Sequence, residues 1–307
     1  MAVTNTESQP VPGGRKDVAV IYPTRNRPEM LMQSLAALLQ NTVLPAEIVV
    51  VDQSDDDATK VALEQFGNPL VRHVPSDLRG LSNSRNVGIE ASTGALIGFL
   101  DDDCIPAPDW VASALRAAGD FPQSQILIGE VYDEINEISG AALAGLTPRI
   151  VTLQGRNDPW IVGPTGGNSF FRRQVFEAVG VFDPVLGQGA EFPGAEDADM
   201  VYRVLKCGLE VTYTDAIRVH HLDWRNDEAN INNTYNYGLG VGAMFAKHAA
   251  AGDRYPKRYI FARRFMIKFL AAPCYLLLAR RVAYRRSVNW LRGIREGFSG
   301  WEKMNEP

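Results

Sequence analysis

The stretch Arg79-Gly-Leu-Ser-Asn-Ser-Arg-Asn-Val-Gly-Ile-Glu-Ala-Ser-Thr-Gly-Ala-Leu-Ile-Gly-Phe-Leu-Asp-Asp-Asp-Cys-Ile-Pro106 decides the fold. It predicts a helix over residues 82–91, a short turn, and a buried strand over 95–100 that carries no charge. The strand ends at three consecutive carboxylates, Asp101, Asp102 and Asp103. In an open α/β sheet, ligands bind beyond the carboxyl ends of the strands. We therefore expect a ligand site at these three acids.

Three adjacent carboxylates repel one another unless a cation lies among them. Ions such as Mg²⁺ take one or two carboxylates together with the oxygens of a bound phosphate. The pattern therefore favours a divalent ion that holds a phosphate-bearing substrate. The alternative is a solvated acidic turn before the next helix, and the Asp-Asp-Asp motif alone leaves both interpretations open.

The sequence before this stretch alternates between two kinds of segment. Strands are expected over residues 17–22, 47–51 and 70–74, and helices over 28–40 and 57–66. This alternation predicts βαβ units, and hence an α/β fold with a mainly parallel sheet and flanking helices. The predicted strands end at polar clusters that should converge at one edge of the sheet: residues 23–27, 52–55 and 101–103.

The pattern after residue 106 is less regular. The expected helices there cover residues 109–118, 174–179 and 196–207. Strands are expected over 125–131, 166–171 and 209–213, with a variable loop at 140–163.

The composition is that of a soluble globular protein, with 307 residues, 46% hydrophobic and 22% charged. The charges are unevenly placed, because residues 253–307 hold 13 of the 31 Lys and Arg and 4 of the 36 Asp and Glu. An acidic body argues against nucleic acid as a partner, and the basic tail favours an anionic partner such as a membrane surface.

The cysteines and the N-terminus indicate the compartment. Cys104, Cys207 and Cys274 are widely spaced and odd in number, which favours a reducing, cytoplasmic location. Residues 1–16 are polar, rich in Pro and Gly, and without the apolar segment of a signal peptide. We expect residues 1–16 to be disordered.

Four segments follow one another in a recognisable order: Val18-Ala-Val-Ile-Tyr-Pro-Thr-Arg-Asn-Arg-Pro28, Glu47-Ile-Val-Val-Val-Asp-Gln-Ser-Asp-Asp56, Ser84-Arg-Asn-Val-Gly-Ile-Glu-Ala-Ser-Thr-Gly94 and Phe99-Leu-Asp-Asp-Asp-Cys-Ile-Pro106. This series resembles glycosyltransferase family 2, whose members are inverting enzymes with the Rossmann-like GT-A fold. The resemblance extends to about residue 221. It implies a GT-A catalytic domain over residues 17–225 that uses a nucleoside-diphosphate sugar.

The resemblance also assigns residues to the donor site. It implies that Thr24, Arg25 and Asp52 line the base and ribose pocket, with Asp77 and Arg85 near the base and the diphosphate. The residues alone favour an Asx turn of Asp52 with Ser54 and Asp55, because such turns are common. The family's Gly-rich strand beside the donor sugar is matched at Gly166, Gly167 and Asn168, where missing side chains let the substrate approach the backbone.

The acids match the family's Asp-X-Asp motif at residues 101–103. The resemblance implies that Asp101, with Asp102 beside it, approaches the ribose, while Asp103 and Asp101 hold Mn²⁺ or Mg²⁺. A histidine after the last strand completes the metal shell in some relatives, and we expect His220 in that place slightly more than His221. A structural histidine is the alternative.

The segment Gly194-Ala-Glu-Asp-Ala-Asp199 resembles the family's Glu-Asp motif at the start of a helix. The resemblance implies that Asp197 is the catalytic base, which takes the proton from the acceptor hydroxyl. Glu196 would be its neighbour or a ligand of the acceptor. The alternative is that both acids only stabilise a helix N-terminus.

The expected function is a metal-dependent transfer of one sugar to a glycan or lipid-linked saccharide in cell-surface polysaccharide assembly. The Gln-X-X-Arg-Trp motif of processive synthases is absent from the sequence, which disfavours repeated addition. A sugar-nucleotide nucleotidyltransferase is the alternative enzyme, but it needs a Gly-rich basic loop that residues 22–27 do not provide. A non-catalytic, membrane-bound adaptor that binds nucleotide sugars is the other alternative.

Residues 226–307 are expected to form a helical, basic C-terminal region. Its longest apolar run, residues 269–279, is too short to span a bilayer. Basic amphipathic helices with aromatic residues suit a membrane surface, so we expect peripheral contact through residues 253–307 on the inner face of the cytoplasmic membrane. The alternatives are a helical pair packed on the catalytic domain, or a homodimer contact.

Overall fold

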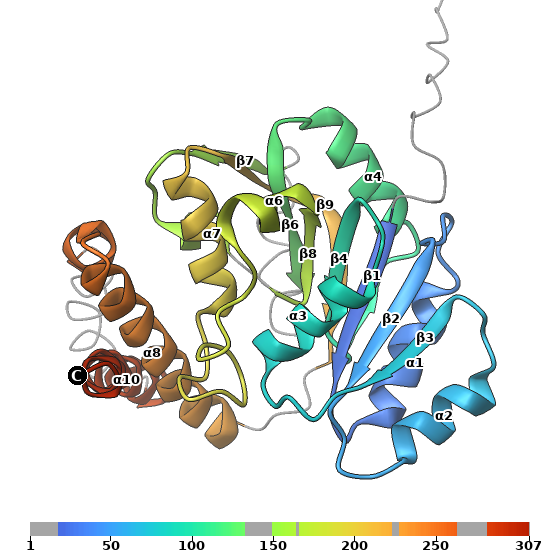
Figure 1. Ribbon diagram of the computed structural model, residues 1–307, viewed down its shortest axis with the longest axis horizontal. Helices are drawn as coiled ribbons and strands as arrows, with labels where there is room; N and C mark the ends of the chain where they lie inside the picture. Colours follow the sequence, from blue (N-terminus) through green and yellow to red (C-terminus); the bar gives the residue numbers. More distant parts are fainter. Residues whose placement is uncertain (1–17, 133–148, 164–165, 223–226, 263–280, 307) are drawn as a thin grey trace, which may run out of the picture.

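The computed structural model describes residues 18–132, 149–163, 166–222, 227–262 and 281–306. Within these ranges, nine strands form one sheet in the order β3-β2-β1-β4-β8-β6-β9-β5, and β7 pairs with β9 beside this path. Helices lie on both faces of the sheet (Figure 1). The predicted α/β fold is confirmed. The expected disorder of residues 1–16 and the apolar run at 269–279 fall outside the described residues.

A parallel block forms the first half of the sheet. The strands β1 (Val18–Thr24), β2 (Glu47–Asp52), β3 (Val71–Pro75) and β4 (Leu96–Leu100) all run in one direction. Strands β1 and β4 are buried along their whole length, which explains their uninterrupted apolar sequence. The carboxyl ends of the parallel strands lie at one edge of the sheet, as we expected from the polar clusters that follow them.

Successive strand residues point to opposite faces and build two separate cores. One face, with Val20 and Val50, packs against α1 (Pro28–Leu38), α2 (Ala58–Phe66) and α4 (Trp110–Asp120). The other face, with Ile21 and Phe99, packs against α3 (Leu81–Ala91), α6 (Gln174–Val179) and α7 (Glu196–Lys206). The helices α3 and α7 carry site residues, so the second core fixes their positions relative to the strands.

The second half of the sheet is mixed. The strands are β5 (Cys104–Pro106), β6 (Ser124–Tyr132), β7 (Ile150–Gln154), β8 (Asn168–Arg172) and β9 (Glu210–His221). Strand β8 runs antiparallel to both β4 and β6, whereas β6 and β9 are parallel.

Two strand predictions in this half were wrong. The last strand was expected to end at residue 213, but β9 continues to His221 because its outer half pairs with β5 and β6. Residues 140–163 were expected to form a loop, yet β7 lies within them. Strand β7 is an edge strand with alternate residues exposed, so its sequence lacks the apolar run of a buried strand.

The C-terminal helix pair, α8 (Asp227–Ala250) and α10 (Arg281–Met304), lies beside α7 (Figure 1). A short π-helix, Pro256–Phe261, follows α8. Val241 and Ile294 of this pair share an apolar cluster with Tyr202 of α7. The pair therefore packs on the catalytic domain, as one sequence-based alternative proposed. In the described part of the chain, no helix is both long and apolar enough to cross a bilayer.

Glycines set the spacing between α8 and α10. Gly238 and Gly242 on α8 face Gly293 and Gly297 on α10, and a Cβ at any of them would meet the backbone of the other helix. A Cβ at Gly240 would likewise meet the backbone of Gly194, in the loop before α7. These close backbone approaches fix the C-terminal helix pair against the site.

Candidate active site

A cavity of about 920 Å³ opens at the carboxyl ends of β1 and β4. It extends from the loops after β1 and β2, past the start of α7, to the C-terminal helix pair. Most of the residues predicted from sequence line it, together with several others: Thr24, Arg25, Arg27, Gln53, Arg85, Asp101, Asp102, Asp103, Trp160, Gly166, Gly167, Glu196, Asp197, His221, Tyr237 and Trp290.

Hydrogen bonds and an ion pair join the loop after β1 to the loop after β2, where both border the cavity. Asn26 adopts a left-handed backbone conformation with φ of 55°, which this residue type tolerates. Its amide side chain donates to Asp55 at 2.7 Å and accepts from the Asp55 N–H at 2.9 Å. Arg25 lies beside this turn, 3.3 Å from the Asp55 carboxylate. The turn therefore presents Arg25 to the cavity.

Arg27 is the main partner of the predicted Asp-X-Asp motif. Its guanidinium lies 3.1 Å from Asp102 and 3.2 Å from Asp103. Thr24 donates its hydroxyl hydrogen to Asp102 at 2.7 Å. Burial raises the pKa of Asp102 to about 7 despite these partners. The middle acid is thus bonded by both Thr24 and Arg27, and all three acids border the cavity.

Arg85 joins the two groups of acids. Its side chain is 1% exposed and lies 3.0 Å from Glu196 and 3.5 Å from Asp101. The guanidinium also packs against the rings of Phe99 and Phe182. This buried cation partly compensates acids that come from β4 and from α7.

Gly166 and Gly167 make room for this arrangement. A Cβ at Gly166 would collide with the Arg85 guanidinium, and a Cβ at Gly167 would lie 2.6 Å from the Asp101 carboxylate. In the structure, the missing side chains therefore admit protein groups. The approach of a substrate to this backbone stays a prediction.

Asp197 lies at the first turn of α7. Its carboxylate accepts the N–H of Gly166 at 3.0 Å and the N–H of Ala198 at 2.7 Å. Burial, and then the negative charge of Glu196, raise the pKa of Asp197 to about 7. The preceding Ala195 has a φ of 65°, a left-handed conformation that costs a non-glycine residue about 1 kcal/mol. Strained backbone of this kind often marks a functional site.

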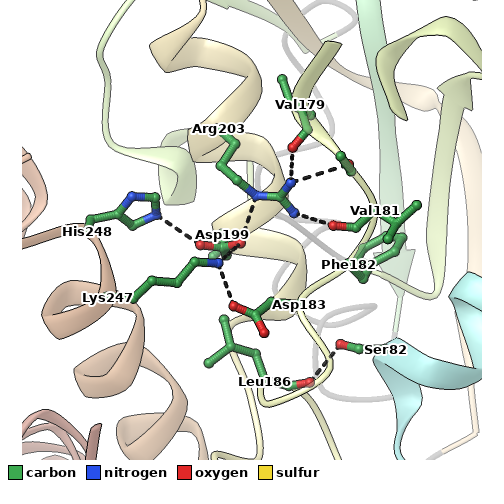
Figure 2. Close-up of polar contacts among 12 residues, drawn as sticks. Ser82, Val179, Val181, Phe182, Asp183, Leu186, Asp199, Arg203, Lys247 and His248 are labelled. Carbon is green, nitrogen blue, oxygen red and sulfur yellow. Dashed lines mark hydrogen bonds and ion pairs between the residues drawn. The ribbon is translucent and has the colours of Figure 1, made fainter. Parts of the chain in front are cut away.

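Asp199, two residues later, lies in a cluster of cations (Figure 2). Its oxygens lie 2.9 Å from Arg203, from Lys247 and from His248. Lys247 also lies 2.7 Å from Asp183. Lys247 and His248 belong to α8, so the cluster ties α8 to the helix that carries Asp197.

Three residues predicted for the donor site do not line the cavity. Asp52 accepts from the Ser54 N–H at 2.9 Å and lies 2.9 Å from His73, so it makes the Asx turn that was left open. Asp77 is exposed between β3 and α3. Asn168 is fully buried and bonds the Trp110 side chain and two backbone carbonyls. Donor contacts by these residues stay predictions.

The structure places His221, not the preferred His220, at the cavity, and metal binding by either histidine stays a prediction. Strand β9 alternates its side chains, and it directs His221 to the cavity, 3.7 Å from Asp103. His220 is the β-bridge partner of Ile105 and is not among the cavity-lining residues. Side chains alternate between the two faces of a strand. A predicted strand that reached residue 221 would therefore have placed His220 and His221 on opposite faces.

Sequence reasoning also left several cavity residues out of the site. Gln53 donates to the Gly80 carbonyl at 3.0 Å and so joins the loops after β2 and β3. Trp160, Tyr237 and Trp290 come from segments outside the recognised motifs. No local pattern marks these three aromatics, because the contacts that bring them to the cavity are tertiary.

The acids fit a divalent cation that is completed by its substrate. All three acids border the cavity, and each also has a partner in the protein: Asp102 bonds Thr24 and Arg27, Asp103 lies 3.2 Å from Arg27, and Asp101 lies 3.5 Å from Arg85. Among the described residues, no cluster of three His, Cys, Asp or Glu side chains could hold a metal ion. Mg²⁺ and Mn²⁺ suit such an open oxygen donor set, because phosphate oxygens supply further ligands.

A comparison with known families matches residues 19–180 to the model described as "Glycosyl transferase family 2". Two relatives come from Haloferax volcanii. Glucosyl-dolichyl phosphate glucuronosyltransferase is 26% identical over 66% of this chain and 68% of its own length. Glycosyltransferase AglE is 35% identical over 66% of each chain. The matched part of this chain therefore spans about two thirds of these relatives.

A solved structure shares the fold over nearly the whole chain. It is the mannosyltransferase PcManGT from Pyrobaculum calidifontis in complex with GDP-Man and Mn²⁺, with a TM-score of 0.65 and 18% identity. The match covers 96% of this chain and 90% of that one, so it includes the C-terminal region. At this identity the likeness establishes the GT-A-like fold alone.

Proposed function

The chain belongs to glycosyl transferase family 2, and on this premise we propose that it transfers one sugar from a nucleoside-diphosphate sugar to an acceptor hydroxyl with inversion. The acceptor oxygen forms a bond to the anomeric carbon while the bond to the diphosphate oxygen breaks on the opposite face. Asp197 takes the proton of the acceptor hydroxyl, and the diphosphate leaves with the electron pair.

The observation that carries this proposal is that one cavity contains both the groups that could bind the donor diphosphate and a carboxylate that could act as the base. Arg25 and Arg27, which could recognise a diphosphate, line the same cavity as Asp197. A general base works best when its pKa lies near the operating pH, and that of Asp197 is raised to about 7. The carboxylate also accepts two backbone N–H groups, which fix its orientation.

The remaining residues position the donor and balance its charge. Arg85 holds Asp101 and Glu196 in place from beneath the cavity floor. Asp101 and Asp103, with His221 beside them, are the groups that would hold Mn²⁺ or Mg²⁺. When bound, such an ion supplies Lewis-acid stabilisation of the negative charge on the diphosphate.

The test compares donor binding with sugar transfer, using a panel of UDP- and GDP-sugars with and without Mn²⁺. We expect Asp103→Ala to lose Mn²⁺-dependent donor binding. We expect Asp197→Ala to keep donor binding and to lose transfer and hydrolysis. Asp120→Ala, an exposed acid at the end of α4, is the matched control. Normal transfer by Asp197→Ala would refute the assignment of the base.

We also propose that the acceptor is presented at a membrane surface, as a lipid-linked saccharide on the inner face of the cytoplasmic membrane. The support is α10, where Arg292 and Arg295 are 63% and 79% exposed and together outnumber their single acidic partner, Glu296, at 2.9 and 3.7 Å. Clustered basic side chains bind anionic lipid. The name of one relative, which acts on a glucosyl-dolichyl phosphate, agrees with such an acceptor.

Vesicle sedimentation of the full chain tests this part. We expect binding to phosphatidylglycerol vesicles, weaker binding by the Arg292→Glu/Arg295→Glu variant, and little binding to neutral phosphatidylcholine vesicles. Equal sedimentation of the wild type and the variant would refute membrane contact through α10, while the transferase proposal would stand. A homodimer contact through the same surface would appear as a concentration-dependent mass in analytical ultracentrifugation.

A further inference from the structure

Three aromatic side chains line the end of the cavity that lies beyond α7. They are Trp160 of the 3₁₀-helix Pro159–Ile161, Tyr237 of α8 and Trp290 of α10, and we call them the aromatic wall. Tyr237 and Trp290 come from facing turns of the helix pair, since a Cβ at Gly238 would meet the Trp290 carbonyl oxygen. The wall is therefore built by helix packing.

The aromatic wall adjoins the loop just before α7, the helix that carries the catalytic acids. A Cβ at Gly194 would lie 3.1 Å from the Cα of Tyr237, and Gly194 precedes Asp197 by three residues. Trp160 is fixed on two sides, because its N–H donates to Asp158 at 3.1 Å and its ring packs on Phe245. These contacts place the wall beside the carboxylate that would receive the acceptor proton.

Charge separates the two ends of the cavity. The lining residues from α8 and α10 are uncharged, namely Tyr237, Val241 and Trp290, and the charged lining group next to Trp160 is a carboxylate, Asp158, which would repel an anionic ligand. The loop after β1 supplies Arg25 and Arg27, which are the kind of groups that recognise phosphate. In Figure 1, α8 and α10 lie on one side of α7, and β1 lies on the other. A diphosphate fits the arginine end, and a neutral ligand fits the wall.

We propose that the aromatic wall binds the ring of a neutral saccharide acceptor, an inference that rests on the proposed function and adds the class of its acceptor. The C–H groups on one face of a sugar ring carry partial positive charge and pack on the negative face of an aromatic ring. Apolar faces joined to a few placed polar groups are typical of small-ligand sites.

Polar groups border the aromatic wall, as hydroxyl recognition requires. Tyr237 is 46% exposed, and its hydroxyl oxygen accepts from Asn233 at 3.0 Å. Gln188, which lines the cavity, donates to the same Asn233 at 3.4 Å. A hydrocarbon chain would instead bury these amide and hydroxyl groups at a cost. The border therefore favours the saccharide over a lipid chain as occupant.

The experiment measures acceptor KM and donor KM separately for methyl and octyl glycosides, the latter below its micellar concentration. The donor is the nucleotide sugar that the wild type hydrolyses fastest. We expect Trp290→Ala to raise the acceptor KM about fivefold to tenfold for both glycosides, with a much smaller change in donor KM. Trp290→Phe should recover most of this loss. Trp301→Ala is the control, because Trp301 lies on the same helix and packs on Phe192 outside the cavity.

Four other outcomes would overturn the inference about the aromatic wall, and a fifth would refute the proposed function. An unchanged acceptor KM in Trp290→Ala would show that the wall does not bind the acceptor. A rise for the octyl glycoside alone would assign the wall to a lipid chain, and an equal rise in donor KM would assign it to the donor. Wild-type enzyme that hydrolyses the donor but transfers to neither glycoside would also refute a neutral saccharide acceptor. Absence of donor binding and hydrolysis in the wild type would instead refute the proposed function.

Discussion

Asp197 and Asp199 lie two residues apart at the start of α7, yet their surroundings shift their pKa values in opposite directions. Burial and the neighbouring charge of Glu196 raise the pKa of Asp197 to about 7. Burial alone would also raise the pKa of Asp199, but His248, Lys247 and Arg203 together hold it well below its usual range. Residue type and place in the helix are nearly the same, so the difference comes from the partners.

This contrast separates a chemical role from a structural one. Asp199 is charged and fully compensated, so it stabilises the packing of α8 on α7 (Figure 2). Asp197 is under-compensated and borders the cavity, so it can exchange a proton near neutral pH. The C-terminal helix pair contributes to both, because it supplies two cations to Asp199 and packs on the loop before Asp197.

The largest expected effect is on stability. Asp199→Asn leaves Arg203, Lys247 and His248 without their common anion, and removing one partner of a buried ion pair costs about 3–5 kcal/mol. We expect this loss in the free energy of unfolding from urea denaturation at pH 7. The Glu228→Gln variant, which breaks an exposed pair with Arg285, should leave the urea midpoint unchanged. A urea midpoint equal to that of the wild type would show that Asp199 does not stabilise the fold.

The next effect is on turnover. Asp197→Asn keeps the size of the side chain but cannot accept a proton, and general bases contribute about 10²–10⁴-fold to rate. We expect kcat to fall by at least about 100-fold, with donor affinity by calorimetry near the wild-type value. Because folding raises the pKa of Asp197, ionising it opposes folding above the pKa of the unfolded chain. The urea midpoint at pH 8 should therefore equal or exceed that of the wild type.

A smaller effect is expected at Lys247, which bridges Asp199 and Asp183. Lys247→Met removes one of the three cations and leaves Arg203 and His248 in place. A lost charge-assisted hydrogen bond in a partly buried site costs about 1–3 kcal/mol. The urea midpoint should lie between those of wild type and Asp199→Asn. A loss equal to that of Asp199→Asn would show that the cluster acts as one unit.

The mildest perturbation is a change of pH. The base must be ionised, so kcat/KM for transfer should rise about tenfold per pH unit below pH 7 and level off above it. In Lys247→Met, which acts through Asp199, the midpoint of this profile should stay where it is in the wild type. A midpoint near pH 4 would show that Asp197 is solvated like an ordinary aspartate.

The sequence predicted the parallel block and the strand-end clusters because short-range patterns encode both. Apolar runs marked β1, β2 and β4, and the acids after β4 lie at the cavity as expected. Strand β7 escaped prediction because an exposed edge strand has no apolar run. The sequence could not tell which of His220 and His221 borders the cavity, because that depends on where β9 ends.

Most of the site features that the sequence did not predict depend on contacts between residues far apart in the chain. Asp52 matches its motif, but its carboxylate is used by His73 and Ser54. Asn168 is likewise committed to Trp110. The aromatic wall depends on α8 and α10, which both follow the last recognised motif, Gly194–Asp199. Local pattern could place each group along the chain but could not say which atoms it meets.

The glycine contact between α8 and α10 has a practical meaning for redesigning acceptor choice. Because the two backbones touch at Gly238 and Gly293, any larger residue there would shift Tyr237 and Trp290 together. Side-chain exchange at positions 237 and 290 leaves that scaffold intact. A library confined to those two positions would therefore vary the acceptor pocket while the helix spacing stays constant.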